Sequence, residues 1–264
     1  PAPGGQPQGL MPRIFDNIEL PLLPALRETL AVSQRADFCV GYFNLRGWRA
    51  VDDLVGRWSG GAGGQARVLV GMQTLPDEAL RKAYSLHHAQ ASMLDNATSQ
   101  RLKRQLAETF RAQLTYGLPT AQDEAGLRRL ARQLRAGQVA VKLHLAFPLH
   151  AKLYLLYRQD PNNPVTAFLG SSNLTLAGLA AQGELNVDVL DHDATAKLVQ
   201  WFEDRWADRW CLDISAELAD IIETSWAREV PVPPHHIYLK MAWHLSHEAR
   251  AGLTEYRLPR PFDT

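Results

Sequence analysis

The chain has 264 residues, of which 46% are hydrophobic and 21% are charged, enough for one large domain or a domain with an appendage. Its formal net charge is zero, so no overall positive field announces a nucleic-acid partner. The two cysteines form no Cys-x-x-Cys pair, and no apolar run approaches the roughly 18 residues of a membrane helix. We therefore expect a cytoplasmic protein without a membrane segment or a disulfide framework.

The N-terminal part of the sequence alternates predicted strands and helices. Residues 1–12 are rich in Pro and Gly and predict a flexible tail. Apolar spacing predicts a helix over 20–30, and a run of apolar residues predicts a buried strand over 36–43. A helix with one apolar face follows over 48–58, and a Gly-rich loop leads to a strand over 66–72. This order favours a crossover unit in an α/β sheet.

A long helical excursion is predicted over residues 76–136, and basic side chains outnumber acidic ones between 101 and 142. Arginines on such helices can neutralise phosphates and line a nucleic-acid groove. An ordinary solvated helix face explains the same charges equally well, so both interpretations stay open. The candidate nucleic-acid contacts are Arg101, Arg104, Arg128, Arg129 and Arg132.

The sheet resumes after the excursion. Short apolar runs predict further strands over 139–145, around 149–155, over 166–169 and over 185–190. Amphipathic patterns then predict helices over 194–210, 215–226 and 235–251. The last of these helices carries His244, His247 and Glu248, an order that matches no metalloprotease motif and lacks a third ligand, so we predict no metal site.

Three of these predicted strand ends carry polar side chains that suit a phosphate. His150 and Lys152 lie two apart on an extended strand and so point to the same face. Ser171 and Asn173 repeat that spacing after the next apolar run, and Glu184 precedes the third run. Together they supply an imidazole, an ammonium, two small hydrogen-bonding groups and a carboxylate, which can hold and attack a phosphate.

In this order, and with a glycine directly before Ser171, the five side chains resemble the half-site of the phospholipase D superfamily, in its nuclease-like branch. That half-site is His-x-Lys followed by Gly-Ser-x-Asn and an acidic residue. Many members also carry an Asp four residues beyond the Lys, where this chain has Leu156, and the nearest acid is Asp160 in a turn. The partner of His150 therefore stays open. The resemblance implies an α/β fold, a mixed sheet with helices on both faces and one half-site per chain.

The resemblance also implies a metal-independent phosphodiesterase that needs no cofactor. His150 would attack phosphorus to form a phosphohistidine, and Glu184 would orient its ring. Lys152, Asn173 and the Ser171 hydroxyl would hold the non-bridging oxygens. Because the chain has a single half-site, we expect a homodimer in which a second His150 protonates the leaving group.

The expected substrate is a nucleic acid, DNA in the simplest interpretation, cut as by an endonuclease in a restriction or defence setting. The chain also resembles the N-terminal part of larger proteins that continue into a helicase. We thus expect a catalytic domain over 13–212 and a helical appendage over 213–264 that leads to a downstream helicase. Two alternatives are a non-catalytic DNA-binding or dimerisation module and a phospholipid hydrolase. The lack of a membrane segment and of a second half-site argues against the hydrolase.

Overall fold

The computed structural model describes residues 12–71, 96–115, 120–228 and 234–255. Two compact units make up the chain, Pro1–Ala227 and Arg228–Thr264. Most of the predicted N-terminal tail and the first part of the predicted helical excursion lie outside the described residues.

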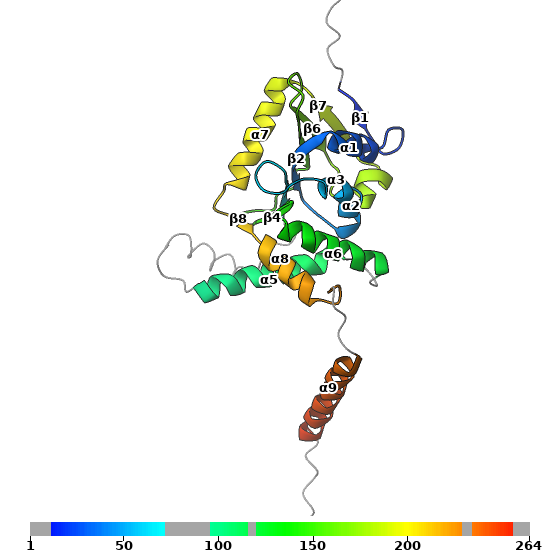
Figure 1. Cartoon of the computed structure of the whole chain (residues 1–264), viewed down its shortest axis with the longest axis vertical. Coiled ribbons are helices and arrows are strands. Elements are labelled where there is room, and N and C mark those ends of the chain that lie inside the picture. Colours follow the sequence, from blue (N-terminus) through cyan, green and yellow to red (C-terminus); the bar gives the residue numbers. More distant parts are fainter. Residues whose placement is uncertain (1–11, 72–95, 116–119, 229–233, 256–264) are drawn as a thin grey trace, which may run out of the picture. The chain divides into compact units, whose positions relative to one another are not determined.

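A mixed sheet of eight strands forms the centre of the first unit, within the described residues (Figure 1). Its strands are β1 (Ile14–Phe15), β2 (Ser33–Val40), β3 (Ala66–Gly71), β4 (Val139–His144), β5 (Leu153–Arg158), β6 (Val165–Gly170), β7 (Asn186–Val189) and β8 (Cys211–Asp213). They are arranged in the order β1-β7-β6-β5-β2-β3-β4-β8. The strands β2, β3 and β4 run parallel, and the other neighbouring pairs are antiparallel.

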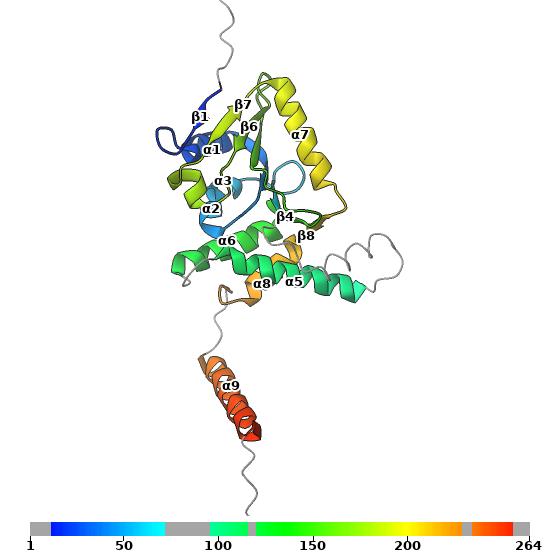
Figure 2. The same ribbon diagram turned by 180° about the vertical axis from the view of Figure 1, so that it is seen from behind.

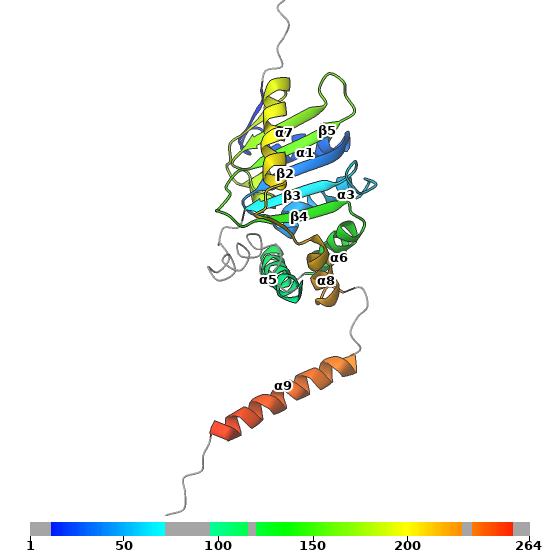
Figure 3. The same cartoon turned by 90° about the vertical axis from the view of Figure 1, so that its left-hand side faces the viewer.

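The two faces of the sheet belong to two separate hydrophobic cores. Successive side chains of a strand point to opposite faces, so Phe38 joins one core and Cys39 the other. The first core contains side chains of α1 (Leu22–Ala31), α2 (Leu45–Arg49) and α3 (Asp52–Val55). On the other face, α7 (His192–Trp206) lies across the strands (Figure 3). The prediction of an α/β sheet with helices on both faces is confirmed.

One predicted helix differs from the structure. In place of the single helix expected over 48–58, the chain forms two short helices, α2, which already begins at Leu45, and α3. Val51 separates them, with φ −135° and ψ −10°, which is not helical. The apolar face of the segment over 48–58 is nevertheless buried as expected, because Trp48, Val51 and Val55 all lie in the core.

Three helices gather beyond the β4–β8 edge of the sheet: α5 (Asn96–Leu114), α6 (Ala121–Arg135) and α8 (Ser215–Thr224) (Figures 1 and 2). The described parts of the expected excursion thus form α5 and α6. We expected the sheet domain to end at residue 212, but β8 pairs with β4, and Ile214 and Leu218 are fully buried. The compact unit therefore continues through α8 to Ala227.

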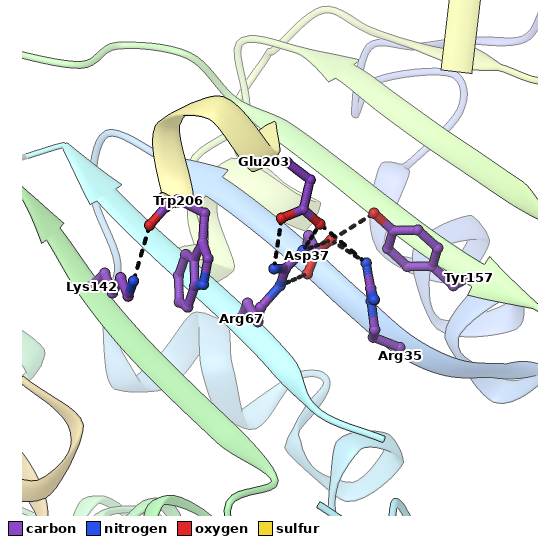
Figure 4. Close-up of polar contacts among 7 residues, drawn as sticks. All are labelled: Arg35, Asp37, Arg67, Lys142, Tyr157, Glu203 and Trp206. Carbon is purple, nitrogen blue, oxygen red and sulfur yellow. Dashed lines mark hydrogen bonds and ion pairs between the residues drawn. The ribbon is translucent and has the colours of Figure 1, made fainter. Parts of the chain in front are cut away.

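A buried ion network fastens α7 to the sheet (Figure 4). Asp37 on β2 is fully buried and accepts two hydrogen bonds from Arg67, at 2.6 and 2.7 Å, and one from the Tyr157 hydroxyl at 2.6 Å. Arg67 also donates to both carboxylate oxygens of Glu203 on α7, at 3.0 and 2.6 Å. A buried carboxylate is costly unless it is paired, so these contacts hold β2, β3, β5 and α7 in one arrangement.

The second unit contains one described helix, α9 (Pro234–Glu255). Its His247 ring stacks on Trp243, with centroids 5.1 Å apart and planes 7° from parallel. Across the described ranges, no three His, Cys, Asp or Glu side chains are grouped so that they could hold a metal ion. None of the described helices combines the length and apolar composition that a bilayer crossing requires.

Candidate active site

The predicted site residues lie at one edge of the sheet, the edge formed by the ends of β2 and β6 and the starts of β5 and β7. β6 ends where β5 and β7 begin, because Leu153 pairs with Leu169 and Gly170 pairs with Asn186. The end of β2 lies beside the start of β5, where Cys39 pairs with Leu153. This edge therefore carries all five predicted side chains, which are His150, Lys152, Ser171, Asn173 and Glu184.

The segment that leads to His150 crosses the ends of β2 and β3 at two glycines. A Cβ on Gly71 would lie only 1.9 Å from the Leu149 carbonyl oxygen. A Cβ on Gly41 would lie 3.6 Å from that oxygen and 3.9 Å from the His150 Cα. Real Cβ atoms do not approach an oxygen within 1.9 Å, so the backbone at His150 depends on the missing side chain of Gly71. These glycines were not predicted as site residues; Gly41 directly follows β2, and Gly71 is the last residue of β3.

His150 itself is exposed, and its ring makes no hydrogen bond to any described residue. The Lys152 ammonium donates to the backbone carbonyl of His150 at 2.7 Å and so lies beside it. Leu156, which stands where many phospholipase D-like proteins have an Asp, is fully buried in the core. The neighbourhood of His150 is thus cationic and open to solvent.

Asn173 is oriented by the backbone at the end of β2. Its Oδ1 accepts a hydrogen bond from the Tyr42 N–H at 2.9 Å. The Asn173 Nδ2 group has no hydrogen-bond partner among the described residues. Its two donors are therefore available to an anion. The next residue, Leu174, pairs with Phe43 and accepts a hydrogen bond from the Asn44 N–H at 3.2 Å. The turn after β6 is therefore bonded directly to the chain after β2.

Ser171 and Glu184 have contacts that differ from the expected roles. The Ser171 hydroxyl donates to the Glu184 carboxylate and accepts from the Leu185 N–H at 2.9 Å. A hydroxyl has one proton, so in this arrangement it does not also donate to a phosphate oxygen. No hydrogen bond joins Glu184 to His150 within the described residues. Strand order explains the difference: Glu184 precedes β7, which lies next to β6 and Ser171, whereas His150 precedes β5.

A buried polar cluster stabilises the turn after β6. The Ser172 N–H donates to Asn186 Oδ1 at 3.2 Å, and its hydroxyl accepts from Asn186 Nδ2 at 2.8 Å and donates to the Gly178 carbonyl at 2.7 Å. The Tyr154 hydroxyl donates to the Ser172 carbonyl at 2.8 Å. Burial raises the pKa of Tyr154 well above its usual value, and the charge of Glu184 raises it further. This phenol therefore stays a neutral donor. Asn186 was not among the predicted site residues; its signal is a polar residue at a buried strand position.

The arginines predicted to bind nucleic acid are partly committed to other contacts. Arg129 donates to Asp52 at 2.9 Å, and this carboxylate is buried, so burial raises its pKa while Arg129 lowers it. Arg128 bonds to Glu124 and to the Ala227 carbonyl. Arg104 pairs with Glu108 at 3.2 Å along α5, and Arg101 and Arg132 are exposed. The role of these five arginines as nucleic-acid contacts stays a prediction. Arg129 also stabilises the fold through its contact with Asp52.

Over residues 27–206, more than half of its length, the sequence matches the protein family described as "Cardiolipin synthase, PLD-like domain". No curated protein sequence matches the chain.

Several solved structures are similar to this one. Nuc, a phospholipase D family member from Salmonella typhimurium, is 12% identical, with 77% of this chain and 97% of that chain covered and a TM-score of 0.44. NucT from Helicobacter pylori is 11% identical, with 77% and 98% covered and a TM-score of 0.42. The phosphatidylserine synthase of Haemophilus influenzae Rd KW20 is 14% identical, with 90% of this chain and 46% of that chain covered and a TM-score of 0.45.

Proposed function

The chain belongs to the family of phospholipase D-like domains, and on that premise we propose that it is a phosphodiesterase that cleaves nucleic acid, with DNA as the expected substrate. The observation that carries the proposal is the shared sheet edge, where His150 and Lys152 lie directly before β5 and Asn173 lies in the turn after β6. An exposed imidazole, an ammonium and an amide donor can meet one phosphate there.

In the proposed reaction, a ring nitrogen of His150 attacks phosphorus. A P–N bond forms as the P–O bond to the leaving oxygen breaks, and water then cleaves the P–N bond and frees the histidine. Lys152 and the Nδ2 donors of Asn173 stabilise the charge that develops on the non-bridging oxygens. The tie between Asn173 Oδ1 and the Tyr42 N–H fixes those donors in advance, which avoids reorganising them during the reaction.

Ser171 and Glu184 take positioning roles in this proposal. Their mutual hydrogen bond joins the turn after β6 to the start of β7, and so holds Asn173 in place. The leaving oxygen needs a proton from another group. We propose that a second His150 supplies it, in a homodimer that places two such edges face to face. The expected downstream helicase stays a prediction.

A non-catalytic nucleic-acid-binding module is the second candidate function. The specific observation in its favour is that no described carboxylate bonds to the His150 ring, since Glu184 is occupied by Ser171. An unoriented imidazole is a poorer nucleophile. This candidate predicts that His150 can be removed without loss of any activity.

The test is cleavage of labelled single-stranded DNA, double-stranded DNA and RNA in excess EDTA. His150→Ala should abolish a cleavage that chelation leaves intact. The matched control is His192→Ala, which removes an exposed histidine at the start of α7 and should cleave like the wild type. Cleavage that requires a divalent ion, or that persists in His150→Ala, would refute the mechanism. Hydrolysis of phospholipid vesicles in place of nucleic acid would refute the substrate class.

A further inference from the structure

A cavity of about 320 Å³ lies against the chain after β2, which is hydrogen-bonded to the turn after β6 that holds Asn173 (the Asn173 turn). Its volume is at the lower end of the range of roughly 300–1,000 Å³ that small-ligand sites occupy. The lining comes from the chain after β2, the end of α5 and the start of α6, through Tyr42, Asn44, Arg46, Leu114, Thr115 and Asp123. Tyr42 orients Asn173 through its backbone N–H, and the other lining residues have no role in the proposed reaction.

Arg46 gives this cavity an available positive charge. Its side chain is exposed and makes no hydrogen bond or ion pair with any described residue. The carboxylate in the lining, Asp123, is buried and already accepts hydrogen bonds from the Thr120 hydroxyl at 2.7 Å and the Thr120 N–H at 3.1 Å. The Thr120 hydroxyl lowers the pKa of Asp123, and the charges of Arg46 and Arg49 lower it further. Two arginines thus face one carboxylate, which leaves a net positive charge.

Two residues that line the cavity donate backbone hydrogen bonds to the Asn173 turn of the proposed site. Tyr42 donates through its N–H to Asn173, and Asn44 donates through its N–H to the Leu174 carbonyl. The Asn44 side chain also caps α2, because its Oδ1 accepts from the Gly47 N–H at 2.9 Å. A Cβ on Gly47 would lie 2.3 Å from the Leu174 carbonyl oxygen, so the first turn of α2 rests directly on the Asn173 turn.

We propose that this cavity binds the nucleotide next to the scissile phosphodiester, with Arg46 contacting the phosphate of that nucleotide. The inference rests on the proposed function and adds a subsite to it. A polymeric substrate presents a second phosphate near the one that is cleaved, whereas a small diester does not. Arg46 stands on an element fixed to the Asn173 turn, so it can bind that second phosphate in a constant register with the first. The Tyr42 side chain in the lining offers a ring against which the sugar or base can pack.

The experiment compares two substrates and three proteins. The substrates are a single-stranded oligonucleotide and bis(p-nitrophenyl) phosphate, a diester without a neighbouring phosphate. The proteins are the wild type, Arg46→Ala and Arg57→Ala. Arg57 is a matched control, since it is an exposed arginine that bonds to backbone carbonyls, one of them on Ala31 at the end of α1, near the start of β2 and so far from the end of β2 that carries the site. Both kcat/KM and oligonucleotide affinity across a salt series, in EDTA, are measured.

Arg46→Ala should lower kcat/KM for the oligonucleotide about 10-fold and leave that for the small diester within about twofold. The slope of log affinity against log salt should fall by about 0.7, the value for one phosphate contact on a single strand. Equal losses with both substrates, or an effect no larger than that of Arg57→Ala, would overturn the inference and leave the proposed function standing. If the wild type cleaves neither substrate, the proposed function fails, and the binding series alone then supports or overturns the subsite.

Discussion

Substituting Gly71 by alanine should disable the site and leave the sheet folded. The added Cβ would lie 1.9 Å from the Leu149 carbonyl oxygen, whereas ordinary contact begins at 3.4 Å. The Leu149 carbonyl, and with it His150, must therefore move by about 1.5 Å, the difference between these two distances. A misplacement of about 1 Å at a reacting group can cost roughly 100-fold in rate. We predict that Gly71→Ala lowers kcat for phosphodiester cleavage at least about 100-fold.

The stability cost should be much smaller than the catalytic one. Overpacking a folded protein costs roughly 1–3 kcal/mol, against a typical unfolding free energy of about 5–15 kcal/mol. The assay pairs single-turnover cleavage with urea unfolding followed by circular dichroism. The control is Gly63→Ala, because a Cβ there meets nothing within 4 Å and its φ is not in the left-handed region. Full activity in a folded Gly71→Ala protein would refute the reasoning that this glycine positions His150.

Further predictions concern the ion network, the buried histidine and the predicted arginine contacts. Arg67→Met should destabilise the fold by about 3–5 kcal/mol in urea unfolding, because it leaves Asp37 buried without its main partner; a loss below about 1 kcal/mol would contradict this. Burial lowers the pKa of His144 below its usual value of about 6.5, so below that pH the unfolded chain binds a proton that the folded chain does not. Stability should therefore fall as pH falls from about 6.5 towards the folded pKa, by at most about 1.4 kcal/mol per pH unit, and urea unfolding of His144→Gln should show a weaker dependence. Arg129→Ala should destabilise the fold through the buried Asp52, and a purely nucleic-acid role for Arg129 would instead leave urea unfolding unchanged.

Local sequence patterns predicted many of the strands and helices. The strand expected over 66–72 is β3, Ala66–Gly71, and the one expected over 139–145 is β4, Val139–His144. One face of each strand is wholly apolar and joins the first core, and that pattern distinguishes both strands from their surroundings. Boundaries were predicted less well: the helix expected over 194–210 is α7, His192–Trp206, and Asp191 caps it by accepting a hydrogen bond from the Ala194 N–H at 2.8 Å.

Pairings between distant segments could not be predicted from the sequence. Periodicity placed a strand over 36–43, but nothing in it indicates that β2 lies antiparallel to β5. The contact of Glu184 with Ser171, in place of the expected contact with His150, has the same cause. Glu184 and His150 were linked by their order in a motif, whereas the sheet order places Glu184 beside Ser171. The positive charge of Arg129 was likewise evident from the sequence. Its pairing with the buried Asp52, however, depends on how α6 packs against the first helices.

The stereochemical course at phosphorus tests the central claim most directly. A phosphorothioate diester of known configuration is hydrolysed in isotopically labelled water, and the configuration of the product is determined. Attack by His150 followed by attack of water comprises two inversions, so the account predicts retention of configuration. Inversion would mean that water displaces the leaving group in a single step, which would contradict a phosphohistidine intermediate and leave His150 without its proposed role as the nucleophile.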